Sequence, residues 1–366
     1  MQVTIQKSAL SEILSVSRFA APKSAALPAL EGVLLKAENG RLTACCTTID
    51  TMAEASADAE VAREGAVLLP AKIFVDLVKV LPDGPVTLTK EENDVLVSYD
   101  GSRTMLRGYP AEQFPEPPSA EGDVEFVLSG EKFRDMLRGV SYAALADKTR
   151  PIFTGVLFEL KNGRLRLVAT DTHRLAWKEA NVQTEGEARV IVPCTELEKA
   201  VALLAGETVV VSLGKTHVNI SAADAGVTLR LIAGVYPDYE KVVPGNFISE
   251  IKVDKNRLED ALKRIILFLD AEPVVHFVIK EDTLTASHTS AGGSVNEKLN
   301  IEKSGADVEI RFNCHYLLEA LRIVNTEKTL LKLTGPRSAA LIYPAGESGG
   351  LSLLLPAIPK GSEAAA

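Results

Sequence analysis

Apolar and polar residues alternate over much of this chain, and short stretches with helical spacing interrupt the alternation. The first such stretch runs from residue 7 to about residue 20 and places Leu10, Ile13 and Leu14 on one face. It directly follows the alternating stretch Val3–Ile5. The pattern predicts a strand and then an amphipathic helix at the start of the chain.

The same pair of elements recurs twice. An alternating stretch at Glu125–Leu128 precedes helical spacing from 129 to about 142, and another at Glu250–Val253 precedes helical spacing from 254 to about 267. Ser129 and Asp254 stand where a helix N-cap is expected. A second helix is predicted after each pair, with the bounds Ala71–Leu81, Thr195–Leu204 and Cys314–Val324.

Strands joined by tight turns lie between the two helices of each set. Asn39-Gly40 separates the alternating stretches Gly32–Glu38 and Arg41–Cys46, and Asn-Gly is a strong signal for a two-residue hairpin turn. Asn162-Gly163 occupies the same place further along, and residues 280–282 do so in the third set. The sequence therefore predicts antiparallel sheets with paired helices, an α+β fold.

The sets are copies of one another. Gly32, Leu42, Thr47 and Pro70 return 123 positions later as Gly155, Leu165, Thr170 and Pro193. A fainter third copy has Leu284 in the place of Leu165, and Asn313-Cys314 in the place of Pro193-Cys194. This period is longer than the roughly 20–50 residues of a solenoid repeat. We expect three similar domains at 1–120, 121–247 and 248–366, with a disordered tail at 359–366.

Composition narrows the class of protein. The chain has 46% hydrophobic and 24% charged residues, and no apolar run long enough for a membrane helix. The four cysteines show neither a C-x-x-C nor a metal-ligand spacing, which favours buried reduced thiols. The N-terminus lacks the features of a signal peptide. We expect a cytoplasmic protein with no cofactor, no bound metal and no membrane partner.

The net charge of −9 argues against a protein that simply coats nucleic acid, but local charge matters more than the total. Basic residues recur on corresponding predicted helices, and a few lie in loops. On any one helix this could be a solvated face, whereas the recurrence favours a surface that tracks phosphates without reading sequence. The candidates are Lys72, Lys79, Arg134, Arg138, Lys199, Arg257, Lys263, Arg264 and Arg322 on helices, with Lys23, Lys148 and Arg150 in loops.

Motifs of known catalytic sites are missing from the sequence, including G-x-S-x-G, the P-loop and H-E-x-x-H. The one dense polar cluster is Asp171-Thr172-His173-Arg174, which follows a predicted strand. Asp171 and His173 could carry acid–base chemistry or bind a metal. The other copies do not repeat the cluster, so a binding surface or a structural pair between Asp171 and Arg174 is favoured over catalysis.

The segment Ala169–Ala176, preceded by Thr149-Arg150-Pro151, closely resembles the middle domain of the bacterial β sliding clamps. These proteins are the processivity subunits of DNA polymerase III. Tyr236-Pro237-Asp238-Tyr239 and Leu353-Leu354-Leu355-Pro356 are similar to two further motifs of the family. The resemblance extends over essentially the whole chain.

The resemblance implies a head-to-tail homodimer, a closed ring of six similar domains around double-stranded DNA. Two different surfaces of the chain then meet in each interface. By analogy with the family, Arg103, Thr104 and Leu106 of one subunit meet Ile266 and Leu267 of the other. An acidic exterior and a basic lining would explain how a negatively charged protein holds DNA.

The family also implies a peptide-binding cleft between copies two and three. Short linear motifs of the polymerase III catalytic subunit, the clamp loader, other polymerases and repair proteins would dock there. The matching residues are Phe153, Thr170, Thr172, His173, Arg174, Leu175, Pro237, Lys241, Val242, Leu353, Leu355 and Pro356. Thr172 stands where the family often has Gly, and Lys241 where some members have Arg.

The sequence thus favours a non-enzymatic DNA sliding clamp. Two other hypotheses remain: a peptide-binding scaffold that does not encircle DNA, and a hydrolase or lyase centred on Asp171 and His173. The mass in solution distinguishes the first two, because a ring requires a dimer.

Overall fold

The computed structural model describes residues 1–22, 24–25, 27–115, 123–147, 149–204, 208–346 and 349–358. The candidate DNA contacts Lys23 and Lys148, and the predicted disordered tail at 359–366, lie outside the described residues. The chain divides into two compact units. The first comprises Met1–Phe133, Gln183–Gly186 and Thr195–Leu231, and the second comprises Arg134–Val182, Glu187–Cys194 and Ile232–Ala366.

The order of elements repeats three times along the chain. The first repeat has β1 (Gln2–Gln6), α1 (Lys7–Ser17), β2 (Gly32–Glu38), β3 (Arg41–Thr47), β4 (Thr51–Asp58), β5 (Glu60–Arg63), β6 (Gly65–Pro70), α2 (Ala71–Val80), β7 (Pro85–Glu91), β8 (Asp94–Tyr99) and β9 (Ser102–Leu106). The second has β10 (Val124–Ser129), α3 (Gly130–Arg138), β11 (Gly155–Lys161), β12 (Arg164–Thr170), β13 (Arg174–Asn181), β14 (Ala188–Pro193), α4 (Cys194–Leu203), β15 (Thr208–Leu213), β16 (His217–Ala222) and β17 (Ala225–Arg230). The third has β18 (Ser249–Asp254), α5 (Lys255–Ile266), β19 (Val274–Lys280), β20 (Thr283–Ser290), β21 (Gly293–Gly305), β22 (Val308–Asn313), α6 (Cys314–Ala320), β23 (Lys328–Leu333), β24 (Ala340–Pro344) and β25 (Gly350–Leu354).

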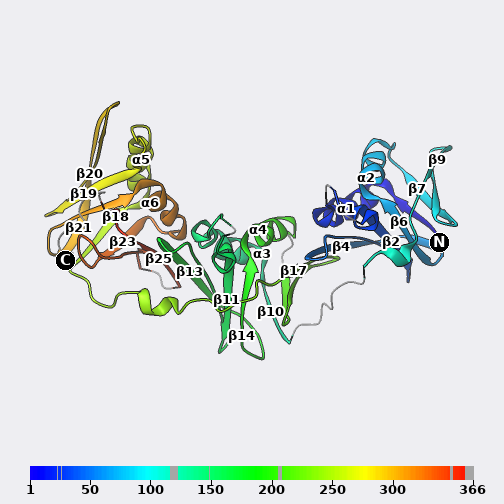
Figure 1. Ribbon diagram of the computed structural model, residues 1–366, viewed down its shortest axis with the longest axis horizontal. Helices are drawn as coiled ribbons and strands as arrows, with labels where there is room; N and C mark the ends of the chain where they lie inside the picture. The colour runs from blue at the N-terminus through cyan, green and yellow to red at the C-terminus, as the bar shows by residue number, and fades with distance from the viewer. Residues whose placement is uncertain are drawn as a thin grey trace. The chain divides into compact units, whose positions relative to one another are not determined.

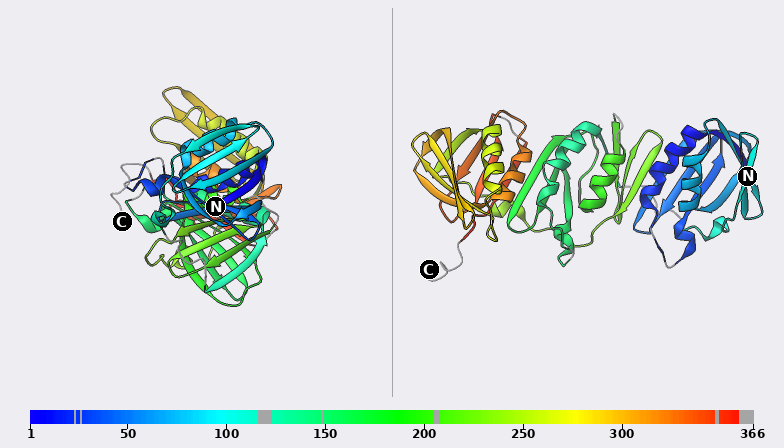
Figure 2. Two further views of the ribbon diagram at one scale, coloured as in Figure 1. Left: turned by 90° about the vertical axis from the view of Figure 1, so that its right-hand side faces the viewer. Right: turned by 90° about the horizontal axis from the view of Figure 1, so that it is seen from above.

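Every strand pairing named in the described residues is antiparallel. One sheet has the order β5-β1-β7-β8-β9, a second has β10-β15-β16-β17-β4-β3-β2-β6, and a third runs β14-β11-β12-β13-β25-β24-β23-β18-β21-β20-β19-β22. Helices α1 and α2 contact each other and cover strands of the first repeat, as Figure 1 and Figure 2 show. Helices α5 and α6 contact each other in the third repeat. The predicted α+β fold is confirmed.

The predicted turns and caps have the expected geometry. Asn39 and Gly40 have φ values of 51° and 74°, and Asn162 and Gly163 have 52° and 71°, as a tight hairpin turn requires. The Asp254 carboxylate accepts the N–H of Arg257 at 2.8 Å and caps α5. Ser129 Oγ accepts the N–H of Lys132 at 3.2 Å at the start of α3. Local sequence therefore sets these element boundaries.

Three helices end several residues before the predicted residue: α1 at Ser17 and α6 at Ala320, each continuing directly as a 3₁₀ turn, and α3. α3 ends at Arg138, and the chain continues into a 3₁₀ turn at Ser141–Ala143 instead of remaining helical to about residue 142. Gly139 follows the helix, and a Cβ there would lie 2.7 Å from the side chain of Lys178. The absence of a side chain at this glycine allows β13 to approach the helix end closely.

All four cysteines are buried and form no disulfide. Burial raises the pKa of Cys46 and of Cys314 to about 12. Both thiols therefore stay protonated and unreactive at neutral pH, in agreement with the predicted structural role. In the described part of the chain, no helix has the length and apolar character needed to cross a membrane.

Candidate functional site

The polar cluster of residues 171–174 is a tight turn between β12 and β13. The hydroxyl of Thr170 donates to the carbonyl of Arg174 at 2.6 Å and accepts the N–H of Thr172 at 3.2 Å. Thr172 has a φ of 80°, an unusual value for a β-branched residue. Its side chain and that of His173 are exposed at the tip of the turn. The turn therefore presents these two side chains to solvent on a hydrogen-bonded frame.

Asp171 supports the turn from inside. One carboxylate oxygen accepts the N–H groups of His173 and Arg174 at 2.9 and 3.0 Å, and the other accepts Nε of Arg174 at 2.9 Å. The predicted structural pair between Asp171 and Arg174 is thus present. Because three donors already engage this carboxylate, it is poorly placed to act as a general base. No cluster of metal-binding side chains occurs among the described residues.

The guanidinium of Arg174 connects the second repeat to the third. Its side chain is only 9% exposed. Nη1 donates to the carboxylate of Glu319 on α6, and the guanidinium carbon lies 4.1 Å from the ring centre of Tyr316 and 5.4 Å from that of Tyr142. Burial alone lowers the pKa of Arg174, but Glu319 and Asp171 together hold it above its ordinary value. Arg174 is a fully engaged cation within the protein rather than an exposed contact.

Strand β25 joins the third repeat to the second beside this turn. Leu353 pairs with Leu175 and Leu354 with Arg174, and the N–H of Leu355 donates to the carbonyl of His173 at 3.0 Å. The hydroxyls of Tyr142 and Ser352 share a hydrogen bond of 2.6 Å beneath the strand. The turn and the C-terminal strand are therefore one structure.

Two apolar side chains of the candidate cleft belong to one buried cluster. Leu175 and Leu353 are buried together with Tyr236 and Tyr239. The ring of Phe153, on the 3₁₀ turn Pro151–Thr154, meets Tyr236 edge-on at 6.3 Å between centroids. Other members of the set remain accessible at the surface, namely Pro237, Lys241, Val242, Leu355 and Pro356. Buried apolar side chains therefore adjoin exposed apolar groups around this turn.

The segment after Tyr236 covers the neighbouring sheet face. The ring of Tyr239 lies 5.9 Å from that of Trp177, and Arg166 lies over Trp177 at 5.2 Å. Arg166 also donates to the Tyr239 hydroxyl at 3.1 Å and to Glu240 at 2.7 Å. These contacts hold the segment that carries Pro237, Lys241 and Val242 in place.

Four residues of this region escaped sequence reasoning: Tyr142, Tyr316, Glu319 and Ser352. Glu319 and Arg174 are 145 positions apart in sequence, and no local pattern connects them. Only the equivalence between the repeats, which places Glu319 on the second helix of the third copy, could have indicated an approach to the turn.

The predicted DNA contacts are divided between the two units, and the structure describes each only by itself. Lys72 and Lys199 lie in the first unit, whereas Arg138, Arg150 and Arg257 lie in the second. These five side chains are exposed and form no ion pair within the described ranges. Lys79, Lys263, Arg264 and Arg322 each contact a carboxylate of the same chain. Arg134 is half-buried, and its Nη1 has no partner in the described part.

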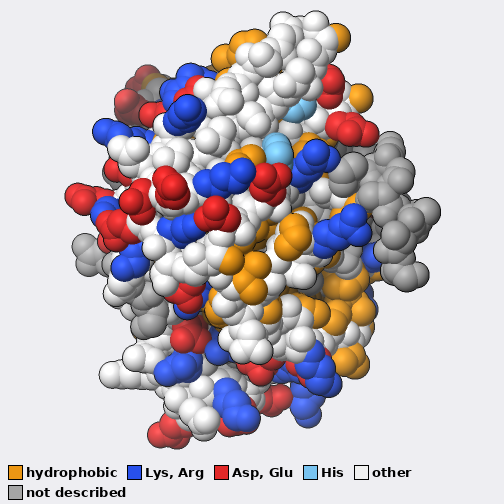
Figure 3. Space-filling view, turned by 90° about the vertical axis from the view of Figure 1, so that its left-hand side faces the viewer, with side chains coloured by type: hydrophobic (Ala, Val, Ile, Leu, Met, Phe, Trp, Pro, Cys, Tyr) orange, Lys and Arg blue, Asp and Glu red, His pale blue; other side chains and the backbone are white. Residues whose placement is uncertain are grey.

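The predicted dimer contacts lie on one strand and one helix end. Arg103, Thr104 and Leu106 are on β9, which pairs with β8 along one edge only among the described strands. Ile266 ends α5, and Leu267 after it is 80% exposed. The space-filling view in Figure 3 shows apolar side chains gathered near the middle of the face that it presents, among interspersed acidic and basic groups.

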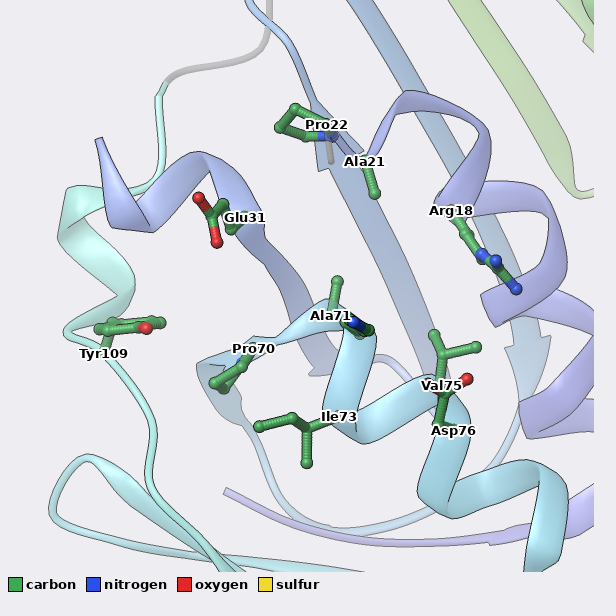
Figure 4. Close-up of a pocket in the computed structure, with 11 residues that line it drawn as sticks. Arg18, Ala21, Pro22, Glu31, Pro70, Ala71, Ile73, Val75, Asp76 and Tyr109 are labelled. Atoms are coloured by element: carbon green, nitrogen blue, oxygen red, sulfur yellow. The ribbon is translucent and has the colours of Figure 1, made fainter. Parts of the chain in front are cut away.

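A separate cavity of about 710 Å³ lies in the first unit, at the start of α2. Figure 4 shows Pro70, Ile73, Val75 and Asp76 on the α2 side, with Glu31 and Tyr109 on other segments around it. Arg18 and Lys72 bring positive charge to its lining, and Glu31 and Asp76 bring negative charge. It contains none of the cleft residues predicted from the sequence.

Comparison with known proteins agrees with these observations. Models of the DNA polymerase III beta subunit match residues 1–118 with the N-terminal domain, 127–238 with the central domain and 240–357 with the C-terminal domain. The β sliding clamp of Synechococcus elongatus is 30% identical over 370 residues, which span 97% of this chain and 99% of the relative. That of Pseudomonas aeruginosa is 29% identical over 365 residues, with the same coverage.

Comparison with solved structures also identifies sliding clamps as similar proteins. A sliding clamp from Pseudomonas aeruginosa bound to griselimycin has a TM-score of 0.91 and 28% identity, over 98% of this chain and 100% of that one. The DNA polymerase III beta subunit of Thermotoga maritima has a TM-score of 0.86 and 27% identity, over 98% and 99%. This chain belongs to the family of bacterial DNA polymerase III beta subunits, the β sliding clamps, which are non-enzymatic processivity factors.

Proposed function

We propose that two copies of this chain associate head to tail in the cytoplasm, close into a ring around double-stranded DNA, and hold the replicative polymerase there. The observation that carries the proposal is a joint that the chain builds twice within itself. The last strand of the second repeat, β17, pairs with β4 of the first, and the last strand of the third repeat, β25, pairs with β13 of the second.

The edges for a third joint of this kind are present but unused within the described chain. β9 is the last strand of the first repeat and pairs only with β8. The beginning of β21 corresponds to β4 and β13, and it pairs there only with β20. The free edge of β9 lies in the first repeat, and the free edge of β21 lies in the third. Pairing β9 of one copy with β21 of another would form the third joint between molecules, and two such joints would close a dimer.

The existing joints also predict the register. Leu229 faces Thr51 in the first joint, and Leu354 faces Arg174 in the second. The equivalent residues at the free edges are Leu106 on β9 and Gly293 on β21. Thr104 would then face Val295, and the exposed Arg103 would face Asn296, next to Glu297. Arg103 would thus lie opposite the amide of Asn296, whereas Glu297 points to the other face of the strand and pairs with Arg264.

The recurring basic side chains fit the inner surface of such a ring. Lys72 and Lys199 are on the second helices of the first two repeats, as Arg322 follows that of the third, and Arg138 and Arg257 are on first helices. Side chains of this kind contact phosphates without reading bases, so they would permit sliding. Enclosure rather than tight binding would keep the ring on DNA.

The site around the turn of residues 170–175 would bind short peptides of the polymerase III catalytic subunit, the clamp loader and other polymerases or repair proteins. The exposed Val242 and Leu355 offer apolar contacts, and Thr172 and His173 offer polar ones. Griselimycin is bound to the Pseudomonas clamp, so competition between this compound and partner peptides would test whether they share a site on this chain.

The experiment that tests the ring uses DNA topology. The clamp, placed on nicked circular DNA by its loader, should remain through gel filtration and leave after a single cut linearises the DNA. Equal retention on both forms would contradict encirclement. A monomer at all concentrations with intact polymerase binding would instead support the scaffold hypothesis.

A further inference from the structure

Among the described residues of the third repeat, Glu319 is the one charged group that pairs with Arg174 in the turn of residues 170–175, the proposed peptide-binding site, here called the partner site. Its carboxylate accepts Nη1 of Arg174 with one oxygen, and its other oxygen lies 3.9 Å from Nη2 of Arg322. Arg174 in turn holds Asp171, whose carboxylate accepts the N–H groups of His173 and Arg174. A continuous chain of charged hydrogen bonds therefore runs from α6 to the backbone under His173.

The first junction provides an internal control, because it forms the same turn without these charges. The hydroxyl of Thr47 accepts the N–H of Ile49 at 3.0 Å and donates to the carbonyl of Thr51 at 3.2 Å, as Thr170 does in the second junction. Ile49 has a φ of 80°, the value found at Thr172. The N–H of Arg230 donates to Asp50 as that of Leu355 donates to His173.

At the first junction, two neutral side chains and a lysine replace the ionic chain, and an exposed ion pair joins Arg230 Nη1 to Asp50 at 3.0 Å. By the alignment of the repeats, Thr48 stands in the place of Asp171 and Thr51 in that of Arg174, and the exposed Lys199 stands in the place of Glu319. The N–H of Thr51 donates to the hydroxyl of Thr48 at 3.1 Å, so an uncharged side chain performs the task of the Asp171 carboxylate. The ionic chain is consequently not needed to form the turn or to pair the strands.

We propose that Glu319 is a positioning residue of the partner site. It acts through Arg174 and Asp171 to hold the exposed tip, Thr172 and His173, in one conformation before a peptide arrives. This inference rests on the proposed peptide-binding function. A tip that is already ordered loses less conformational entropy on binding, so the ionic chain raises affinity without touching the peptide. The planar guanidinium suits this role because the rings of Tyr142 and Tyr316 flank it.

The test compares Glu319→Gln and Glu319→Ala with the control Glu302→Gln. Glu302 forms an exposed ion pair with Lys328 in the same repeat. Binding is measured to the purified polymerase III catalytic subunit of the same organism, immobilised on a sensor surface. We expect about five-fold weaker binding for Glu319→Gln, about ten-fold for Glu319→Ala and no change for the control. Dimer mass should be the same for all variants.

Amide hydrogen exchange provides a second readout that does not depend on any partner. Loss of Glu319 should speed exchange at His173 and Arg174 at least several-fold, while the amide of Thr51, which is equivalent to that of Arg174, stays unchanged. Unaltered exchange at His173 and Arg174 would overturn the inference. Equal acceleration at both turns, or across the whole third repeat, would show a merely structural role and overturn it too. A wild-type protein that fails to bind the polymerase would refute the proposed function, and the exchange result would still decide the role of Glu319.

Discussion

The two internal junctions of this chain have the same backbone but different side chains. Both pair the last strand of one repeat with a strand of the preceding repeat, and both place a β-branched residue at a φ of 80° in the adjoining turn. At the second junction, Asp171, Arg174 and Glu319 form an ionic chain in which Asp171 and Arg174 are buried and Glu319 is partly exposed. At the first, threonine hydroxyls make the corresponding bonds.

The outer sheet faces of the two junctions differ as well. Tyr239 and Arg166 pack on Trp177 at the second junction. At the first, Glu54 occupies the place of Trp177 and lines a hollow of about 620 Å³ together with Leu34 and Cys45. Strand pairing therefore builds the joint, and under the proposed function the ionic and aromatic groups adapt the second joint to partner binding. Substitutions at the two junctions can separate the contribution of strand pairing from that of the ionic and aromatic side chains.

The largest difference should come from Arg174→Ala and its counterpart Thr51→Ala. Removing the guanidinium leaves Asp171 and Glu319 without their cation, which costs about 3–5 kcal/mol for a buried pair. Thr51→Ala removes no hydrogen bond of its side chain within the described structure and should cost less than about 1 kcal/mol. Urea unfolding of both variants measures the two losses of stability. Equal losses would contradict a special role for the ionic chain.

Trp177→Ala should have the next largest effect. The half-buried indole packs on Tyr239 and under Arg166, so its removal should destabilise the second unit by about 2–3 kcal/mol. Trp177→Phe keeps most of the packing and serves as the control, with a loss of about 1 kcal/mol. Tryptophan fluorescence is lost in both variants, so circular dichroism must follow the unfolding. A loss below about 0.5 kcal/mol would mean that Trp177 does not anchor the segment that follows Tyr236.

Substituting glycine for Thr172 or Ile49 should change the stability less than the substitutions above, and in the opposite direction. Replacing Thr172 or Ile49 by Gly relieves a φ of 80° but adds conformational freedom to the unfolded chain. We expect each variant to be neutral or more stable by up to about 1 kcal/mol. Thermal unfolding of the pair tests whether the turns are equally strained. Clear destabilisation of one variant alone would show that its side chain is needed for the fold.

The smallest expected effect is on the pH dependence of stability, and it arises from Glu54 at the first junction. Burial raises the pKa of Glu54 above its ordinary value of 4.5. The folded state then binds more protons than the unfolded state, so this group's contribution to stability falls as pH rises above about 4.5. Glu54→Gln should therefore be more stable at pH 7 by a few tenths of a kcal/mol, with the gain disappearing below pH 4. A gain that grows in acid would contradict the assignment.

Local features of this molecule could be predicted from sequence, and distant contacts could not. The turns at Asn39-Gly40 and Asn162-Gly163, the caps at Ser129 and Asp254, and the pair Asp171–Arg174 all depend on residues within a few positions. The early end of α3 depended on the approach of Lys178 to Gly139. The link from Arg174 to Glu319 required the pairing of β25 with β13, which no local pattern encodes.

The repeated joint is the central claim, and a disulfide placed across the third joint tests it most directly. Thr104 and Val295 correspond to Val227 and Ala53, which face each other in the first joint. The four native thiols are buried and should not interfere. On oxidation, a chain carrying both Thr104→Cys and Val295→Cys should give a covalent dimer, whereas Thr104→Cys with Asn300→Cys should remain monomeric in denaturing gels. Cross-linking in the second variant and not in the first would contradict the account.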